Sequence, residues 1–395
     1  MLKSTTLRSR LLGVAISPLM ALAFAAGGAT VANAKGVSYN VLFTFSGSNG
    51  YEPDGNLVKD KAGNVYGTTA LGGADDSGAV FKLAQDGTET VLYSFTDATD
   101  GGYPAANLTM DKAGNLYGTT NYGGAYDNGV VFKLAPDGTE TVLYSFPGVD
   151  VVDPLGGLIL DKKGNLYGTT LAGGSYGNGD VYEVAANGTE TELYAFTGGN
   201  DGGAPAANLI TDAAGNFYST TESGGAYGNG TIFKLAPNGT ETVLYSFTGG
   251  DDGAIPSAGL ITDSTGNLYG TAYNGGSGYG TIFMLSPSGT ETTLYTFTGG
   301  SDGAYPLGDL FRDSSGNLYG TSFFGGANNA GVVFKLSPAG TETVLHAFAF
   351  GGSDGARPKA GLIKVTNQEA GKGELYGTTE RGGSNGDGTI FAVTK

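Results

Sequence analysis

Five aspartates recur at multiples of about fifty residues and carry side-chain oxygens suited to holding a cation. Each stands in an Asp-Gly-Gly or Asp-Gly-Ala segment. Calcium prefers carboxylate and carbonyl oxygens, so these segments are candidate calcium ligands. Asp-Gly is also a common pair in tight turns, and a structural role explains the repetition as well. The five residues are Asp100, Asp201, Asp252, Asp302 and Asp354.

Aromatic side chains form a second candidate site, for a ligand bound by stacking and hydrogen bonding. They occur in segments rich in Gly, Asn and Asp, and the residues around them change from one repeat to the next. Tyrosine offers a stacking face and a hydroxyl group, which suits a sugar or a protein partner. The alternative is that these rings only fill space in glycine-rich loops. The candidates are Tyr103, Tyr122, Tyr126, Tyr176, Tyr227, Tyr273, Tyr279, Tyr305, Phe323 and Phe324.

Residue types that many enzymes use are scarce. The chain has no cysteine, no tryptophan and one histidine, His346, which stands where other repeats carry a tyrosine such as Tyr144. We interpret it as a packing residue, so thiol chemistry, a histidine-based triad and a zinc site of nitrogen and sulfur ligands have no support. Glu222 and Glu380 share a loop position three repeats apart. Such glutamates need not lie within the ~5–9.5 Å that paired-carboxylate glycoside hydrolysis requires. We assign no catalytic residue and expect no cofactor, with calcium as the one alternative left open.

A sevenfold repeat must position these side chains. The segment Asn-Leu-Tyr-Gly-Thr, or a variant of it, recurs at steps of 50 to 57 residues. Each unit alternates apolar and polar residues with a period of two, and tight-turn sequences such as Asp-x-x-Gly-Asn divide it into four short strands. A period near fifty with strand content alone predicts a propeller, in which the repeated tyrosines pack between blades. They are Tyr66, Tyr117, Tyr167, Tyr218, Tyr269, Tyr319 and Tyr376.

The order of the strands predicts how the ring closes. A fourth-type strand at residues 41–45 comes before any other, and the chain ends after a third-type strand at 389–393. Pairing these two segments would complete the last blade and remove a free sheet edge. We therefore predict an all-β, seven-bladed propeller of four-stranded antiparallel blades over residues 35–395. Its longer loops gather on one face, where we expect any ligand to bind.

The first 34 residues have the pattern of an export signal. A basic start is followed by an apolar run and by Ala32-Asn33-Ala34, a small-residue cleavage site. No later segment is long and apolar enough to span a bilayer, so we expect a periplasmic or extracellular protein. The net charge of −17 disfavours binding to nucleic acids. We expect a monomer.

The repeat units resemble a known family. Asp-x-x-Gly-Asn-Leu-Tyr-Gly-Thr-Thr, Gly-x-Val-Phe-Lys-Leu and Gly-Thr-Glu-Thr-Val-Leu-Tyr-Ser-Phe recur together in order. This pattern is similar to the GloVer tandem repeat of exported bacterial proteins and covers essentially all of the chain after the signal. The resemblance implies a propeller, often followed by a C-terminal surface anchor, without an assigned activity. Because the chain stops at Lys395, two residues after the last predicted strand, we expect release rather than surface attachment.

Three functions fit these observations. The first is an exported, non-enzymatic binding protein that recognises a glycan or a surface protein through its loop-rich face. The second is a calcium-dependent propeller enzyme of the lactonase or lyase kind, with a central calcium held by Asp and Asn. The third is a structural protein of the cell envelope, which would self-associate.

Overall fold

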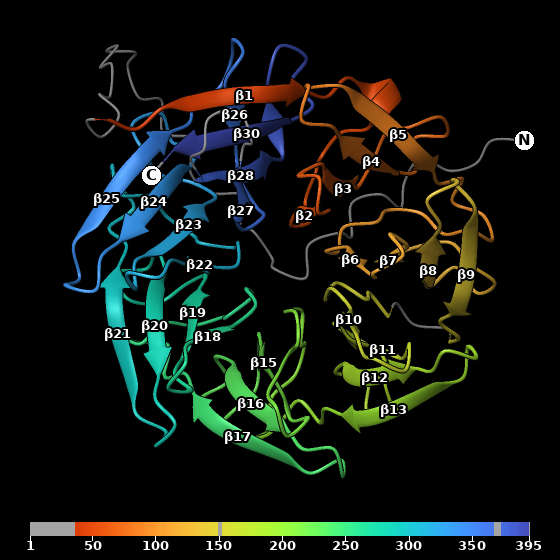
Figure 1. Cartoon of the computed structure of the whole chain (residues 1–395). Helices are drawn as coiled ribbons and strands as arrows, with labels where there is room; N and C mark the ends of the chain where they lie inside the picture. Colours follow the sequence, from red (N-terminus) through yellow and green to blue (C-terminus); the bar gives the residue numbers. More distant parts are fainter. Residues whose placement is uncertain (1–35, 149–151, 367–372, 395) are drawn as a thin grey trace, which may run out of the picture. The chain divides into compact units, whose positions relative to one another are not determined.

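The computed structural model describes residues 36–148, 152–366 and 373–394. They form seven four-stranded antiparallel sheets, or blades, arranged in a ring around a central axis (Figure 1). In every blade except the one that combines both ends of the chain, the strands follow one another in sequence from the innermost to the outermost. The predicted fold class is therefore confirmed. The predicted export signal, residues 1–34, lies outside the described residues.

In the first six blades, tight turns join the first strand to the second and the third to the fourth, and a longer loop joins the second strand to the third. Blades 1 to 3 comprise β2 (Val58–Lys59), β3 (Val65–Thr69), β4 (Ala79–Leu83) and β5 (Glu89–Ser94); β6 (Thr109–Met110), β7 (Leu116–Thr120), β8 (Val130–Leu134) and β9 (Glu140–Ser145); and β10 (Ile159–Leu160), β11 (Leu166–Thr170), β12 (Asp180–Val184) and β13 (Glu190–Ala195). Blades 4 to 6 comprise β14 (Ile210–Thr211), β15 (Phe217–Thr221), β16 (Thr231–Leu235) and β17 (Glu241–Ser246); β18 (Ile261–Thr262), β19 (Leu268–Ala272), β20 (Thr281–Leu285) and β21 (Glu291–Thr296); and β22 (Phe311–Arg312), β23 (Leu318–Ser322), β24 (Val332–Leu336) and β25 (Glu342–Ala347).

The seventh blade combines both ends of the described chain. Its strands are β27 (Ile363–Thr366), β28 (Gly373–Thr379), β30 (Thr389–Thr394) and β1 (Tyr39–Thr44), and β1 pairs antiparallel with β30 as the outermost strand. The predicted closure is confirmed, with a strand that begins two residues earlier than expected. A short 3-10 helix, η1 (Gly47–Asn49), follows β1, and β26 (Gly355–Ala356) pairs with β29 (Arg381–Gly382) in a separate two-stranded sheet.

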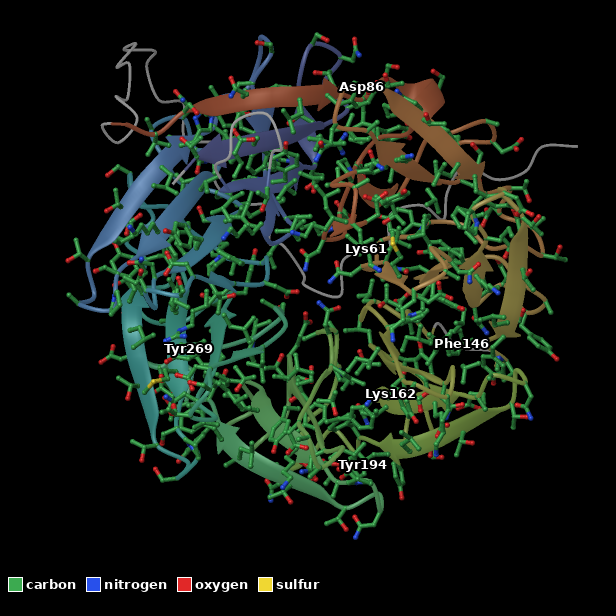
Figure 2. All side chains as sticks on the ribbon, in the orientation of Figure 1. Lys61, Asp86, Phe146, Lys162, Tyr194 and Tyr269 are labelled. Atoms are coloured by element: carbon green, nitrogen blue, oxygen red, sulfur yellow. The ribbon has the colours of Figure 1, made fainter. Side chains whose placement is uncertain are left out.

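Aromatic rings fill the junction between each pair of neighbouring blades. The phenylalanine after an outer strand meets an aromatic residue in the third strand of the next blade, edge to face, with ring centroids 5.0–5.3 Å apart. Phe146 marks one junction, between blades 2 and 3 (Figure 2). Such pairs stabilise beyond their buried area, so the ring is held by seven similar contacts, including Phe45–Phe81 across the closure.

The repeated tyrosines of the second strands do more than pack. In six blades the hydroxyl group donates a hydrogen bond to the aspartate of the preceding turn, as Tyr117 does to Asp111 at 3.2 Å. The same aspartate accepts hydrogen bonds from a backbone N–H and from Asn115. These bonds hold the pKa of Asp111 below its usual range, although burial opposes them. The tyrosine therefore joins the turn to the blade junction.

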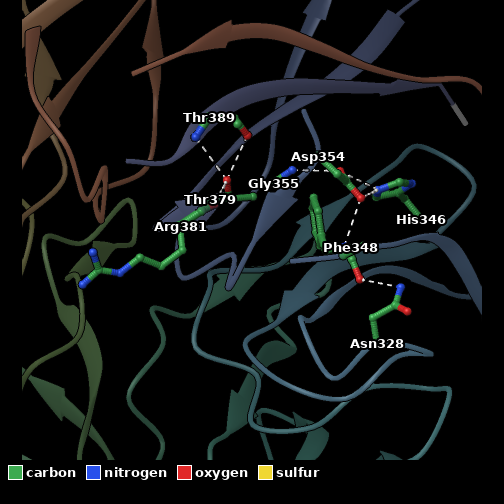
Figure 3. Close-up of polar contacts among 9 residues, drawn as sticks. Asn328, His346, Phe348, Asp354, Gly355, Thr379, Arg381 and Thr389 are labelled. Carbon is green, nitrogen blue, oxygen red and sulfur yellow. Dashed lines mark hydrogen bonds and ion pairs between the residues drawn. The ribbon is translucent and has the colours of Figure 1, made fainter. Parts of the chain in front are cut away.

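His346 replaces one tyrosine in the outer strands, as the sequence indicated. In blades 1, 3, 4 and 5 the tyrosine hydroxyl at this position donates to the aspartate seven residues later, whereas His346 Nε2 lies 3.2 Å from Asp354 (Figure 3). The imidazole is buried and stacks on Tyr39, with ring centroids 3.5 Å apart. Its role as a packing residue is confirmed, because it attaches β1 to the preceding blade.

Four glutamates at the start of outer strands have raised pKa values. Burial is the main cause, and an aspartate that follows the outer strand of the preceding blade adds repulsion. The pKa of each rises to about 7. The residues are Glu140, Glu241, Glu291 and Glu342.

These glutamates should make the fold more stable in mild acid. The pKa of glutamate in the unfolded chain is about 4.3. Between that pH and about 7, the folded chain therefore holds protons that the unfolded chain has released. Stability then falls as the pH rises through this window. We expect a higher melting temperature at about pH 5 than at about pH 8. Changing all four glutamates to glutamine should reduce the difference, and an unchanged difference in that variant would show that other groups cause it.

Candidate functional site

One residue from each blade meets at the central axis, just before the innermost strand. Four of the seven carry short polar side chains and three are glycines. The hydrogen bonds among them link residues up to 305 positions apart in sequence. The seven are Asn56, Asn107, Gly157, Asn208, Gly259, Asp309 and Gly361; we call them the axial ring.

Asp309 is the acceptor at the centre of the axial ring. Its Oδ1 accepts the backbone N–H of Gly259 at 2.6 Å, and its Oδ2 accepts the side-chain amides of Asn56 and Asn208 at 2.6 and 2.8 Å. The amide oxygen of Asn208 accepts the N–H of Gly157 at 2.5 Å, which fixes the orientation of that amide. Burial raises the pKa of Asp309, and the three N–H donors act in the opposite direction.

The glycines of the axial ring are required by close packing. A Cβ atom at Gly157 would lie 2.7 Å from Asn208 Oδ1, and one at Gly259 would lie 2.8 Å from Asp309 Oδ1. At Gly361 it would lie 2.5 Å from the backbone oxygen of Asp309. Seven side chains therefore do not fit at the axis. The asparagine and aspartate side chains fill this space and form the floor of the loop-rich face.

The axial ring does not match the donor set of a calcium site. Calcium needs six to eight oxygen ligands that face the ion, whereas the oxygens of Asp309 and Asn208 already face N–H groups of the protein. The described parts of the chain also contain no group of three or more acidic, histidine or cysteine side chains placed to share a metal.

Seven residues with left-handed backbone conformation surround the axis on the loop-rich face. Each precedes a proline and has a φ between 46° and 59°. Its carbonyl accepts the N–H of the residue after the second strand, and in six blades its own N–H donates to the preceding blade. The left-handed conformation costs roughly 1–2 kcal/mol at a non-glycine residue, and these two bonds hold it. The residues are Glu52, Tyr103, Asp153, Ala204, Ile255, Tyr305 and Arg357.

Charged residues from blades 7 and 1 form a cluster on this face. Lys359 Nζ lies 2.6 Å from Asp54 Oδ2. Arg381 pairs with Glu52, and its Nε lies 3.4 Å from Glu380. Burial raises the pKa of Glu52 and of Glu380, and the neighbouring cations oppose this shift. We call these five residues the charged cluster.

Polar groups continue from the charged cluster into blade 2. Tyr103 lies close to the cluster: burial and then the charges of Asp54, Glu52 and Glu380 raise its pKa. Its ring meets that of Tyr122, with centroids 6.0 Å apart. Asn121 is fully buried, and within the described ranges neither its amide nitrogen nor its oxygen has a hydrogen-bond partner.

Aromatic residues from blades 5 and 6 form a second group on this face, and blade 6 is the neighbour of blade 7. Tyr305 contacts Tyr273, Tyr279 and Phe324, with ring centroids 4.9–6.1 Å apart, and Phe323 lies 4.7 Å from Phe324. Tyr273 and Phe323 are buried, and they contact Tyr305 and Phe324 respectively. We call this set the aromatic arc. Five of the ten aromatic residues predicted from the sequence therefore come together, and Tyr103 and Tyr122 form a separate pair.

The remaining predicted residues are dispersed. Tyr126, Tyr176 and Tyr227 are 58–64% exposed, and each projects from a different blade. The five candidate calcium aspartates each stand beside their own outer strand; Asp252, for example, accepts from the Tyr245 hydroxyl and from the Thr248 N–H. The structure does not bring these aspartates together.

A family model of the Gloeobacter/Verrucomicrobia repeat matches residues 23–170 and 154–391. The chain belongs to this repeat family. The match confirms the resemblance stated above and covers every blade. A search of curated proteins gave no match.

Solved structures of distant proteins resemble this repeat protein at low sequence identity. The extracellular domain of a one-component system from B. thetaiotaomicron has a TM-score of 0.55 at 12% identity, over 92% of this chain and 42% of that one. A gluconolactonase from Xanthomonas campestris has a TM-score of 0.47 at 14% identity, over 73% and 88%. A luciferin-regenerating enzyme has a TM-score of 0.47 at 13% identity, over 91% and 96%. At 12% identity, the likeness to the first of these structures concerns the fold alone.

Sequence reasoning missed the charged residues of this repeat protein. Arg357 and Lys359 flank a proline at positions that are aromatic, aliphatic or small in most other repeats, and Arg381 stands where another repeat has Phe324. These three residues could have been identified from the sequence, because each differs from the residues at the equivalent position in the other repeats.

None of the helices in the described ranges is long and apolar enough to cross a membrane.

Proposed function

We propose that this protein is an exported, non-enzymatic glycan-binding propeller. The observation that carries the proposal is the meeting of the aromatic arc and the charged cluster on one face, joined by Arg357. Sugars bind through their apolar ring faces and their hydroxyl groups together. Aromatic rings next to fixed carboxylates, amides and cations match both features.

The arrangement of the face supports a binding surface rather than a reactive centre. Tyr279, Tyr305 and Phe324 are partly exposed, and Tyr305 and Phe324 pack against the buried Tyr273 and Phe323, which support the stacking surface. The left-handed residues fix the backbone from which Tyr305 and Arg357 project. A surface fixed before binding loses little entropy when the ligand binds. Export follows in this proposal from the signal pattern in residues 1–34.

A glycan array probed with residues 35–395 tests this proposal. We expect at least one glycan to bind, and we expect the double variant Tyr305→Ala, Phe324→Ala to bind it at least about tenfold more weakly, because truncating a central aromatic contact typically costs more than about 1 kcal/mol. Tyr176→Ala is the matched control, since Tyr176 projects from a different blade outside the aromatic arc. Equal binding by the double variant and the control would locate the site elsewhere. Self-association of the wild type in sedimentation would instead favour the structural envelope role.

A further inference from the structure

We propose that the cavity beside Arg357 and Arg381 binds the carboxylate group of an acidic sugar. This inference rests on the proposed glycan-binding function and specifies the class of its ligand. The cavity lies between the loop that follows β25 and the loop that joins β28 to β30. Its volume is about 490 Å³, and it is lined by Phe350, Gly351, Gly352, Arg357, Arg381 and residues 382–386.

Arg357 supplies a cation without a carboxylate partner. The centre of its guanidinium lies 5.8, 5.3 and 5.5 Å from the rings of Phe323, Phe324 and Phe350. No acidic group of the described chain lies within ion-pair distance of it, and its buried Nε has no hydrogen-bond partner there. Aromatic faces stabilise the positive charge and remove it from water, so an anion that enters the cavity meets a partly dehydrated cation.

Arg381 supplies further donors from the other wall. A guanidinium has five N–H groups in a fixed plane, and two of its nitrogens are engaged here, by Glu52 and Glu380. The remaining N–H groups are available on a side chain that those two bonds already hold in place. In Figure 3 this side chain extends away from the Thr379–Thr389 pair. Planar N–H pairs match the two oxygens of a carboxylate better than a lysine ammonium does.

The charge distribution of the chain makes this cavity unusual. Residues 35–395 contain three arginines, Arg312, Arg357 and Arg381, in a chain of net charge −17. Two of the three line one cavity, and Arg312 stacks on Tyr269 elsewhere. The acidic remainder of the protein repels polyanions such as nucleic acids over long distances. The two guanidinium groups act at short range, so a carboxylate that reaches this cavity meets local positive charge on an otherwise acidic protein.

The cavity is continuous with the aromatic arc. Phe324 contacts Tyr305 on one side and Arg357 on the other. Phe350 borders the cavity and is 52% exposed, which leaves a ring face for a second sugar unit. A glycan stacked on Tyr305 and Phe324 can thus extend toward Phe350, with its carboxylate between the two guanidinium groups.

The test compares short oligomers of galacturonate with neutral oligomers of galactose of equal length, by calorimetry with residues 35–395. We expect the wild type to bind the acidic oligomer at least about tenfold more tightly. Arg357→Gln should remove this preference and keep the affinity for the neutral oligomer. Ser384→Glu places a negative charge in an exposed loop that lines the cavity, where misfolding is not expected, and it should also remove the preference.

Controls separate this inference from the proposal on which it rests. Arg312→Gln changes the third arginine, outside the cavity, and should keep the preference. Tyr305→Ala should weaken both oligomers, because it removes stacking rather than charge recognition. Equal affinity of the wild type for the two oligomers, or a preference that survives both Arg357→Gln and Ser384→Glu, overturns the carboxylate site and leaves glycan binding standing. Binding of neither oligomer, together with an empty glycan array, overturns both.

Discussion

Replacing Asp309 by alanine is expected to lower the free energy of unfolding by about 3 kcal/mol or more. The change leaves the N–H of Gly259 and the amides of Asn56 and Asn208 without their acceptor. Each buried donor that loses its partner costs roughly 1–3 kcal/mol, and alanine also leaves a gap at the crowded axis. Urea unfolding, followed by circular dichroism, measures the effect.

Two further variants show whether the axial ring is the cause. Asp309→Asn keeps one oxygen acceptor but turns an N–H₂ group toward a donor, so an intermediate loss is expected. Asp86→Ala removes an exposed carboxylate that accepts one hydrogen bond, from the Thr88 N–H, in a turn at the outer edge of the ring (Figure 2), so a loss of about 1 kcal/mol or less is expected. If Asp309→Ala and Asp86→Ala unfold at the same urea concentration, the axial ring contributes little to stability.

A chain that begins at Ser46 is expected to lose the closed ring. It lacks β1, which supplies the outer strand of blade 7, the stack of Tyr39 on His346 and the buried Phe45. The free edge of β30 then offers unpaired N–H and C=O groups to other chains. Size-exclusion chromatography should show self-association, and the melting temperature should fall by ten degrees or more, on the order expected for losing several kcal/mol from a domain of this size.

Strand addition provides the control for this deletion. A peptide of residues 36–46 should bind the shortened chain and restore its melting temperature, because pairing with an open sheet edge uses main-chain hydrogen bonds. A peptide of the same composition in scrambled order should not. A chain that begins at Ser38 keeps all of β1 and should behave as the full propeller does. A shortened chain that stays monomeric with an unchanged melting temperature would contradict the role assigned to β1.

The residues of the proposed binding face depart from the repeat, whereas the residues that stabilise the fold recur in it. The aromatic pairs at the blade junctions and the tyrosine–aspartate bonds repeat in nearly every blade, as a ring of equal units requires. Arg357, Lys359, Arg381 and the aromatic arc break the repeat, and they do so in neighbouring blades 5 to 7. A site with one orientation on a symmetric frame must arise from such departures.

The sequence by itself determined the ring, its seven blades and its closure. These follow from short-range rules: the period of fifty residues, the alternation of side chains along each strand, and an unpaired strand at each end of the repeats. The same rules placed Tyr305 and Phe324 on the loop-rich face and identified His346 as a packing residue. Each conclusion needs only the local pattern and the count of units.

Only the tertiary structure decided which side chains meet. Asn56, Asn208 and Asp309 are separated by up to 253 residues along the chain, and curvature of the ring brings them into contact. The same holds for Lys359 with Asp54 and for Arg381 with Glu52, which join the two ends of the chain. Tyr126, Tyr176 and Tyr227 follow the same local pattern as Tyr279, yet they project separately. A repeat specifies what each blade presents, whereas the angle and distance between blades specify what those groups can bind together.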